Sequence, residues 1–145
     1  MNYLRPTKSI VKNAIFNILG DIEGLTFVDL FAGTGQIGLE AERRGAKVIF
    51  VEKNRKLAHE IRKKTRGKVV VGDALSFLRN WEGKAHVVFA DPPYIYNRYD
   101  ELINLVLKKL EKGGVFILEH DKRKSFNAPE ERKYGDTVLS IWVKE

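Results

Sequence analysis

The chain has 145 residues, a length that suits a single folded domain, and its 43% hydrophobic and 31% charged residues exclude intrinsic disorder. Lys and Arg total 26 against 19 Asp and Glu, so the formal net charge is +7 and polyanionic partners are favoured. The absence of cysteine excludes disulfides and thiolate metal sites, and neither a secretion signal nor an apolar run of roughly 18 residues is found. We therefore expect a monomeric, cytoplasmic protein without a membrane partner.

The first predicted element is a helix over residues 9–19, because apolar residues recur there at helical spacing, with Ser9 as the N-cap and Gly20 at the end. From residue 26 onward, β-type runs and helical patterns alternate along the chain. The predicted strands are residues 26–31, 47–52, 68–71, 85–90 and 113–119, and the predicted helices are residues 35–44, 54–66, 74–81 and 99–110. This alternation predicts a parallel sheet with helices on both faces.

The last part of the chain has a different pattern. Residues 132–134 and 137–143 are predicted to be two strands on either side of Gly135-Asp136, a dipeptide that is typical of a hairpin turn. Because a hairpin reverses the direction of the chain, the sheet is expected to finish with an antiparallel strand.

A glycine-rich loop follows the first predicted strand. Gly33, Gly35 and Gly38 have the spacing G-x-G-x-x-G between a strand and a helix, and Glu52 closes the next strand about 20 residues further on. Such glycines permit a tight turn and a close approach of a ligand to the backbone, and Glu52 can accept hydrogen bonds from both hydroxyls of an adenosine ribose. The pattern predicts an adenosine-containing cofactor at this loop.

The identity of that cofactor depends on Asp29, at the end of the first strand beside the loop. NAD or FAD would place a pyrophosphate there, which a carboxylate repels, whereas S-adenosylmethionine carries a sulfonium and an ammonium group, which a carboxylate attracts. The sequence therefore favours S-adenosylmethionine over a dinucleotide, and over a tight turn without a ligand, which explains neither Asp29 nor Glu52. The residues expected to contact the cofactor are Asp29, Phe31, Ala32, Gly33, Thr34, Gly35, Glu52, Lys53, Asp73 and Ala74. Asp73 has two interpretations, since it can accept a hydrogen bond from the adenine amino group or cap the helix that Ala74 begins.

The sequence Asp91-Pro92-Pro93-Tyr94 directly follows the fourth predicted strand. Because ligands in open α/β sheets bind beyond the carboxyl ends of the strands, we expect this loop to lie beside the glycine loop. Two prolines stiffen the loop and leave its carbonyl groups free to accept hydrogen bonds. Asp91 and the Pro92 carbonyl can each accept one N–H of an exocyclic base amine, while Tyr94 stacks on the base. The alternative is that the prolines only end the strand and that Tyr94 packs.

These motifs resemble those of a known enzyme family. The segments that carry the resemblance are residues 29–35, Glu52, residues 91–94, Arg5-Pro6-Thr7 with the helix ending at residues 16–19, residues 118–120 and residues 134–137. The first three are similar to the cofactor and catalytic motifs of class I N-methyltransferases. Together, the segments resemble the small-subunit ribosomal RNA guanine-N2 methyltransferases, the RsmD-like proteins.

The resemblance implies a Rossmann-like α/β fold in a single domain over residues 1–145. In this fold a mostly parallel seven-stranded sheet has an antiparallel last strand and helices on both faces. The resemblance implies that residues 1–20 form a segment and helix on the substrate side and that residues 26–145 form the cofactor-binding core. The resemblance further implies that S-adenosylmethionine is the cofactor and that residues 91–94 are catalytic.

The implied substrate is guanine N2 of small-subunit (16S) ribosomal RNA, and Arg5 and Thr7 are implied to lie near the cleft. Members of the family usually carry a further basic stretch before this motif, so an RNA contact is expected elsewhere. Lys63, Lys64 and residues 122–124 are among the candidates. The alternative is that these charges belong to a solvated lysine-rich surface, which is common in thermophile proteins.

Other functions remain open from the sequence. A DNA adenine-N6 methyltransferase uses the same Asp-Pro-Pro-Tyr motif but generally carries a target-recognition insertion, for which this chain has no room. The intact Asp91 and Tyr94 disfavour a non-catalytic RNA-binding module with a retained cofactor fold, and Asp29 disfavours an NAD-dependent oxidoreductase. The three histidines lack metal-ligand spacing, so no metal is expected.

Overall fold

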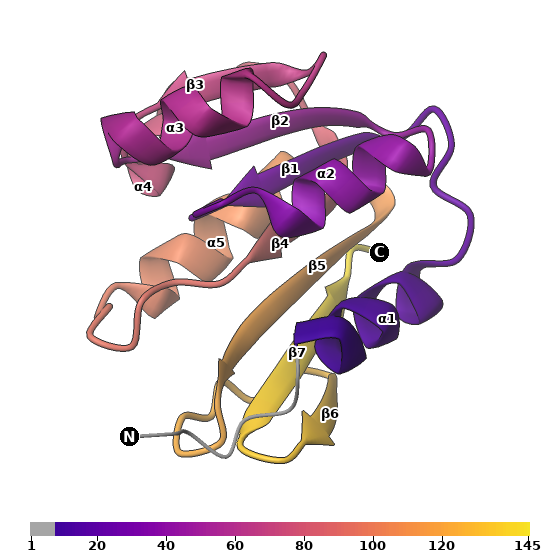
Figure 1. Cartoon of the computed structure of the whole chain (residues 1–145). Coiled ribbons are helices and arrows are strands. Elements are labelled where there is room, and N and C mark those ends of the chain that lie inside the picture. Colours follow the sequence, from indigo (N-terminus) through magenta and orange to yellow (C-terminus); the bar gives the residue numbers. More distant parts are fainter. Residues whose placement is uncertain (1–7) are drawn as a thin grey trace.

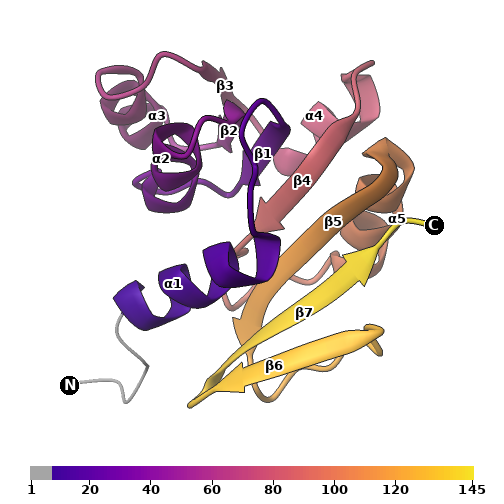
Figure 2. The ribbon, with the colours of Figure 1, turned by 90° about the vertical axis from the view of Figure 1, so that its right-hand side faces the viewer.

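The computed structural model describes residues 8–145, which form a seven-stranded sheet with helices on both faces (Figures 1 and 2). The elements in chain order are α1 (Lys8–Leu19), β1 (Thr26–Leu30), α2 (Gln36–Arg43), β2 (Lys47–Glu52), α3 (Arg55–Arg62), β3 (Lys68–Val71), α4 (Ala74–Asn80), β4 (Ala85–Ala90), α5 (Tyr99–Lys109), β5 (Leu110–Asp121), β6 (Glu130–Tyr134) and β7 (Thr137–Val143). The strand order is β3-β2-β1-β4-β5-β7-β6, and β7 runs antiparallel to both of its neighbours. The predicted sheet, mostly parallel with an antiparallel last strand, is confirmed.

Each face of the sheet carries its own hydrophobic core. Because neighbouring residues of a strand point to opposite faces, Phe27 of β1 packs with α1 and α2, whereas Val28 and Leu30 pack with α4 and α5. All three side chains are fully buried. Figure 2 shows α1, α2 and α3 on one face and α4 and α5 on the other. Burial on both faces explains why these strands are continuous apolar runs in the sequence.

The N-terminal helix α1 is an integral part of one core. Its Ile15 and Phe16 side chains are buried, and the Arg44 guanidinium lies 4.7 Å from the centroid of the Phe16 ring. Burying a side chain of this size stabilises a fold by about 1.5–3 kcal/mol. No helix within residues 8–145 is long and apolar enough to cross a membrane.

The end of β1 differs from the sequence prediction. We predicted a strand over residues 26–31, but β1 ends at Leu30, because Phe31 has a left-handed backbone conformation (φ 56°) that no strand accommodates. The following helix, predicted over residues 35–44, is α2. Gly35 precedes it with φ 82° and acts as its N-cap.

The helix predicted over residues 54–66 is also shorter, since α3 ends at Arg62. The chain then turns, and the Thr65 hydroxyl and the Arg66 backbone N–H both donate hydrogen bonds to the Glu42 carboxylate of α2. This turn leads the chain back to the start of β3. The strand predicted over residues 113–119 extends further in both directions as β5, because it pairs with β4 on one side and β7 on the other.

Candidate active site

The carboxyl ends of β1 to β4 lie along one edge of the sheet, on the left in Figure 1, where a cavity of about 640 Å³ opens. Seven of the predicted site residues line it: Phe31, Glu52, Lys53, Asp73, Ala74, Asp91 and Pro93. Val51, Asn54, Gly72 and Tyr96 complete the lining. The loop after β1 and the loop after β4 therefore border the same cavity, as the sequence predicts.

The three glycines of the loop have different physical roles. Gly33 and Gly35 have φ values of 61° and 82°, which residues with a side chain rarely adopt. Gly38 lies in α2 against β2, and a Cβ atom there would come within 2.3 Å of the Phe50 ring. Phe31 has the same left-handed conformation although its side chain is bulky. Such a conformation costs about 1–3 kcal/mol, and backbone strain of this kind is often found at ligand sites.

Glu52 connects the glycine loop to the end of β2. Its side chain is buried, and its two carboxylate oxygens accept hydrogen bonds from the backbone N–H groups of Gly33 (2.6 Å) and Asn54 (2.8 Å). These bonds fix the direction of the carboxylate. Because a carboxylate has about four acceptor positions, Glu52 can still accept hydrogen bonds from a ligand in the cavity.

Asp29 is not among the residues that line the cavity, and its side chain is only 1% exposed. Its Oδ2 atom accepts the Gly38 backbone N–H at 3.0 Å, so it caps α2 in place of Gly35, which has no side chain. Burial raises the pKa of Asp29 well above its ordinary value; the Gly38 hydrogen bond opposes this effect, and the charges of Asp91 and Glu52 add to it. A cation bound near these carboxylates would favour the ionised form of Asp29.

Asp73 caps a helix and also lies in the lining of the cavity. Its Oδ2 atom accepts the Ser76 backbone N–H at 3.1 Å and so caps α4, and its side chain also lines the cavity beside Ala74. The capping interpretation is therefore confirmed. One capping bond leaves further acceptor positions on the Asp73 carboxylate, which a ligand in the cavity can use.

The Asp-Pro-Pro-Tyr loop forms the other side of the cavity. Asp91 is exposed at its rim, and Pro92 is buried. The Pro93 carbonyl accepts the Tyr96 backbone N–H at 2.9 Å, which closes a turn with Tyr94 at its tip. The Tyr94 side chain is 55% exposed, so the packing alternative for Tyr94 is not supported.

Two basic residues of the segment after β5 lie against this turn. Lys124 donates a hydrogen bond from its Nζ atom to the Tyr94 carbonyl (2.9 Å), and the same atom is 4.7 Å from the centroid of the Tyr94 ring. The Arg123 guanidinium is 5.1 Å from that centroid and is also paired with Asp121. Positive charge therefore lies directly beside the exposed aromatic ring.

Some of the other predicted site residues that the structure describes are not part of the cavity lining. Ala32 donates its N–H to the Val51 carbonyl, and Thr34 is exposed. Arg5 and Thr7 lie outside the described residues. Lys63 and Lys64 follow α3, at the edge where the parallel strands begin, and are not brought together with the Asp91 loop.

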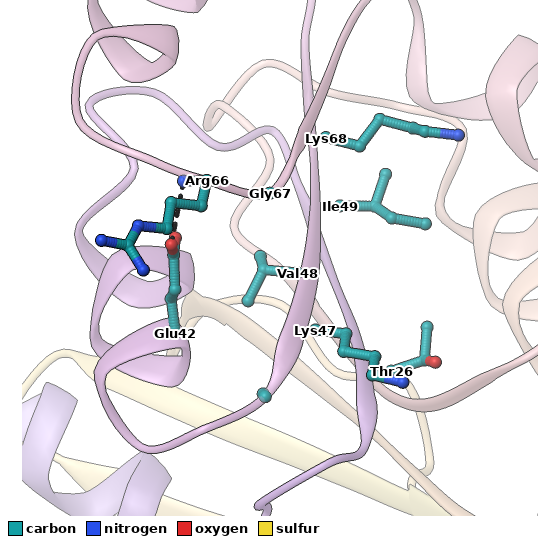
Figure 3. A pocket seen from close by; sticks show the side chains of 9 residues that line it. Thr26, Glu42, Lys47, Val48, Ile49, Arg66, Gly67 and Lys68 are labelled. Carbon is teal, nitrogen blue, oxygen red and sulfur yellow. Dashed lines mark hydrogen bonds between the residues drawn. The ribbon is translucent and has the colours of Figure 1, made fainter.

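That opposite edge carries a second cavity, of about 690 Å³, shown in Figure 3. Its lining includes Thr26, Lys47 and Lys68, which are the first residues of β1, β2 and β3. The Glu42 carboxylate at this cavity accepts the hydrogen bond from the Arg66 N–H at 2.9 Å (Figure 3).

Sequence reasoning missed Tyr96. It lines the first cavity, and its hydroxyl oxygen is a buried side-chain atom without a hydrogen-bond partner among the described residues. A tyrosine two positions after the motif carries no signal of this kind in the sequence. His120 has a structural position instead, since its ring nitrogens bond to Ser140 (2.7 Å) and to the Asp121 carbonyl (2.9 Å), and burial lowers its pKa.

Over residues 8–145, no group of three or more His, Asp or Glu side chains is arranged to hold a metal ion. The lining of the described site offers carboxylates, backbone groups and aromatic rings.

The fold and sequence are similar to those of known proteins. Residues 1–143 match the family described as "Conserved hypothetical protein 95". The ribosomal RNA small subunit methyltransferase D of Haemophilus influenzae is 31% identical over 141 residues, which cover 88% of this chain and 73% of that protein. A hypothetical protein of Thermus thermophilus superposes with a TM-score of 0.84 and 26% identity, covering 98% of this chain and 90% of the other.

A more distant structure shares the fold alone. The Thermus thermophilus 16S rRNA N2 G1207 methyltransferase (RsmC), in complex with AdoMet and guanosine, has a TM-score of 0.80 and 21% identity; the match covers 99% of this chain and 44% of that one. The strand order, the antiparallel β7 and the likeness to the Haemophilus influenzae methyltransferase define a Rossmann-like methyltransferase fold. Within this class, the chain belongs to the Conserved hypothetical protein 95 family, and the small-subunit ribosomal RNA methyltransferases D are its relatives.

Proposed function

We propose that this protein transfers a methyl group from S-adenosylmethionine to the exocyclic N2 amine of a guanine in small-subunit ribosomal RNA. The observation that carries the proposal is the cavity that Glu52, Asp73 and Asp91 share at the carboxyl edge of the sheet. The name of the Haemophilus influenzae relative supports ribosomal RNA as substrate, and that of the RsmC structure supports guanine N2.

The charges of the site fit the cofactor. Asp29, Glu52 and Asp91 lie close enough together for the charges of Glu52 and Asp91 to raise the pKa of Asp29. Such a group of carboxylates attracts a sulfonium and an ammonium and repels a pyrophosphate. Glu52 would hold the ribose hydroxyls and Asp73 the adenine amino group. When bound, S-adenosylmethionine supplies an electrophilic methyl group on a positively charged sulfur.

The loop after β4 would hold the substrate. The lone pair of a base amine is delocalised into its ring, so the amine is a poor nucleophile and must be held in line with the methyl group. The Asp91 carboxylate and the Pro92 carbonyl would each accept one of its N–H groups. As the new N–C bond forms, the bond between the same carbon and the cofactor sulfur would break. Asp91 would stabilise the positive charge on nitrogen, and the proton would pass to water at the exposed rim.

The substrate base must leave its stack to reach this loop, because Asp91 lies at the cavity and not on a flat surface. The exposed Tyr94 ring offers a face for the base, and such stacking contributes about 1–3 kcal/mol per base. Arg123 and Lys124 lie beside that ring and can contact RNA phosphates.

The test is methyl transfer in vitro from tritiated S-adenosylmethionine to 16S ribosomal RNA, small-subunit particles or duplex DNA, followed by digestion to nucleosides. We expect N2-methylguanosine from RNA or particles, and labelling about 10²–10³-fold slower with an Asp91→Ala variant. Label in DNA as N6-methyladenine would replace the proposal by a DNA methyltransferase. Cofactor binding without transfer to any of the three would replace it by a non-catalytic module.

A further inference from the structure

We propose that Ile95 is a wedge, which takes the place of the target guanine between its neighbouring bases when that guanine leaves the stack. The inference rests on the proposed function and deepens it, because it names a residue that keeps the guanine from returning to the stack. Ile95 directly follows the Asp-Pro-Pro-Tyr motif and is not part of the cavity lining.

The first observation is the exposure of the Ile95 side chain. It is 87% exposed, whereas the other exposed large apolar side chains of residues 8–145 are 37% to 56% exposed. Packing within the protein therefore does not account for an isoleucine at this position. The local conformation does not account for it either, because turns favour Gly, Pro, Asn, Asp and Ser. Contact with another molecule is the role that the position supports.

The second observation is the place of Ile95 at the mouth of the cavity. Tyr94 and Ile95 are the central residues of the turn that the hydrogen bond from the Tyr96 N–H to the Pro93 carbonyl closes. The two ends of this turn, Pro93 and Tyr96, both line the cavity. The turn belongs to the loop that projects from the sheet between β4 and α5 in Figure 1. A base that approaches Asp91 therefore passes beside this turn.

The third observation is that the turn is stiff. Pro92 and Pro93 have fixed φ angles, and the Lys124 Nζ atom donates a hydrogen bond to the Tyr94 carbonyl at 2.9 Å. The side chain of Ile95 is stiff as well, since a β-branched residue has a restricted χ1 angle. A stiff apolar side chain loses little conformational entropy when it is inserted between bases. Isoleucine is one of the residues that nucleic-acid-binding proteins use in this way.

The charges around the turn favour RNA over a protein as the molecule that Ile95 contacts. The Lys124 Nζ atom and the Arg123 guanidinium lie 4.7 Å and 5.1 Å from the centroid of the Tyr94 ring. Such cations contact the phosphates of a nucleic acid, whereas lysine is depleted at interfaces between proteins. With phosphates held at Lys124 and Arg123, the apolar side chain beside them meets the bases.

The energetic argument concerns the gap in the stack. A guanine that leaves the stack gives up its contacts with both neighbouring bases and leaves a gap between them. An apolar side chain in that gap restores part of these contacts and removes its own surface from water. Ile95 in the gap would therefore stabilise the state in which the guanine lies at Asp91, next to the Tyr94 ring on which it stacks.

The test compares two RNAs that contain the guanine methylated by the wild type, mapped by nuclease digestion of labelled 16S RNA. In the first RNA the guanine has its natural neighbours, and in the second both neighbours are abasic, so the guanine has no stack to leave. Ile95→Ala should lower kcat/KM for the first RNA about 5- to 30-fold, because the shortened side chain fills less of the gap. For the second RNA, wild type and Ile95→Ala should agree within about twofold.

Three controls separate this role from a structural one. Ile95→Ala should unfold at the wild-type temperature and bind S-adenosylhomocysteine with wild-type affinity, because the side chain is exposed and outside the cavity lining. Ile95→Met keeps an apolar side chain and should retain most of the activity on the first RNA. Val143→Ala also removes an exposed apolar side chain, but Val143 pairs with Val115 toward the amino end of β5, so both activities should be unchanged.

Each RNA is assayed alone and within reconstituted small-subunit particles. An equal loss on both RNAs would overturn the inference, because it is the result expected if Ile95 contacts a ribosomal protein or RNA away from the target. Wild-type activity of Ile95→Ala on both RNAs would overturn it as well, and either result would leave the proposed function intact. Failure of the wild type to methylate RNA in any of these forms would instead contradict the proposed function.

Discussion

The two edges of the parallel part of the sheet carry cavities of similar size, about 640 Å³ at the carboxyl edge and about 690 Å³ at the amino edge. At the amino edge, the Glu42 carboxylate already accepts hydrogen bonds from Thr65 and Arg66, and Lys47 and Lys68 extend from the first positions of their strands. At the carboxyl edge, Tyr96 has a hydroxyl without a partner among the described residues. The kind of lining group, and not the volume, distinguishes the two cavities: carboxylates gather at the carboxyl edge and lysines at the amino edge.

The backbone shows the same difference. Phe31, Gly33 and Gly35 at the carboxyl edge all have positive φ values. Such conformations cost free energy and persist where the surrounding structure imposes them. In a parallel sheet the helices also begin at this edge, so their N-terminal N–H groups converge there. The comparison predicts that substitutions at the carboxyl edge change cofactor binding and chemistry, whereas those at the amino edge do not.

The largest expected effect is on the chemical step. Asp91→Ala should lower kcat about 10²–10³-fold, similar to the loss of one preorganised polar group in other enzymes. Binding of S-adenosylmethionine, measured by calorimetry, should change far less. Asp91→Asn should retain more activity than Asp91→Ala if the acceptor geometry dominates, and no more if the negative charge dominates. Wild-type rates in both variants would show that the loop is structural.

The next effect concerns cofactor affinity. Glu52→Ala removes a charged acceptor from the ribose hydroxyls and should weaken S-adenosylmethionine binding by about 1.5–3 kcal/mol, which is about 10- to 150-fold in dissociation constant. The matched control is Glu42→Gln, which changes the carboxylate at the amino-edge cavity. Glu42→Gln should leave the affinity for S-adenosylmethionine unchanged. An equal loss of affinity in Glu52→Ala and Glu42→Gln would show that the two edges do not differ in cofactor binding. NAD should not bind the wild type at the same concentration.

A smaller effect should depend on pH. The folded protein holds the Asp29 proton more tightly than the unfolded chain does, because burial raises the pKa of Asp29. The stability that this group contributes is therefore fully present below the unfolded pKa of about 3.9 and is lost as the pH rises through the folded value. Urea unfolding of the wild type, measured from about pH 4 to about pH 8, should show this fall in the free energy of unfolding.

In Asp29→Asn, the free energy of unfolding should lack that part of its pH dependence. If the wild type and the variant showed the same dependence on pH, the effect could not be assigned to Asp29. Cofactor binding supplies an independent check. Because a bound cation favours the ionised carboxylate, binding below the folded pKa of Asp29 should release a proton in the wild type. Calorimetry in two buffers of different ionisation enthalpy measures this release, which should be absent from Asp29→Asn.

The sequence predicts the sheet and much of the site because both depend on local patterns. Apolar runs alternating with helical patterns identify the parallel strands, and the motifs around Gly33 and Asp91 come directly after two of them. The left-handed backbone of Phe31 was not predictable in this way, since a bulky residue at positive φ contradicts its own preference. The state of the Tyr96 hydroxyl depends on which groups the packing brings near it, and the sequence does not record this.

The position of Lys63 and Lys64 could have been predicted. The helix of a β-α-β unit begins beyond the carboxyl end of one strand and finishes near the amino end of the next. Lys63 and Lys64 come directly after α3 and before β3, so they belong to the amino edge. Lys124 comes after β5, whose carboxyl end lies on the side of the Asp91 loop, and it contacts Tyr94.

The smallest expected effect tests which of these basic residues contact RNA. Lys124→Ala removes the hydrogen bond to the Tyr94 carbonyl and a positive charge beside the Tyr94 ring, so KM for RNA should rise about three- to tenfold through weaker phosphate and base contacts. If Lys124 contacts one phosphate, the slope of log affinity against log salt should fall by about 0.7.

The matched comparison is the double charge reversal Lys63→Glu with Lys64→Glu. We expect it to change KM by less than about twofold, since both residues lie between α3 and β3 at the amino edge and salt screens exposed charges that do not contact RNA. Each reversal replaces a positive charge by a negative one, so this variant loses more net charge than Lys124→Ala does. If RNA affinity follows the net charge of the protein, the double reversal must have the larger effect. If RNA affinity follows the position of the charge, Lys124→Ala must have the larger effect. The rank order of the two KM values therefore decides whether the RNA contacts are concentrated at the carboxyl edge or spread over the basic surface.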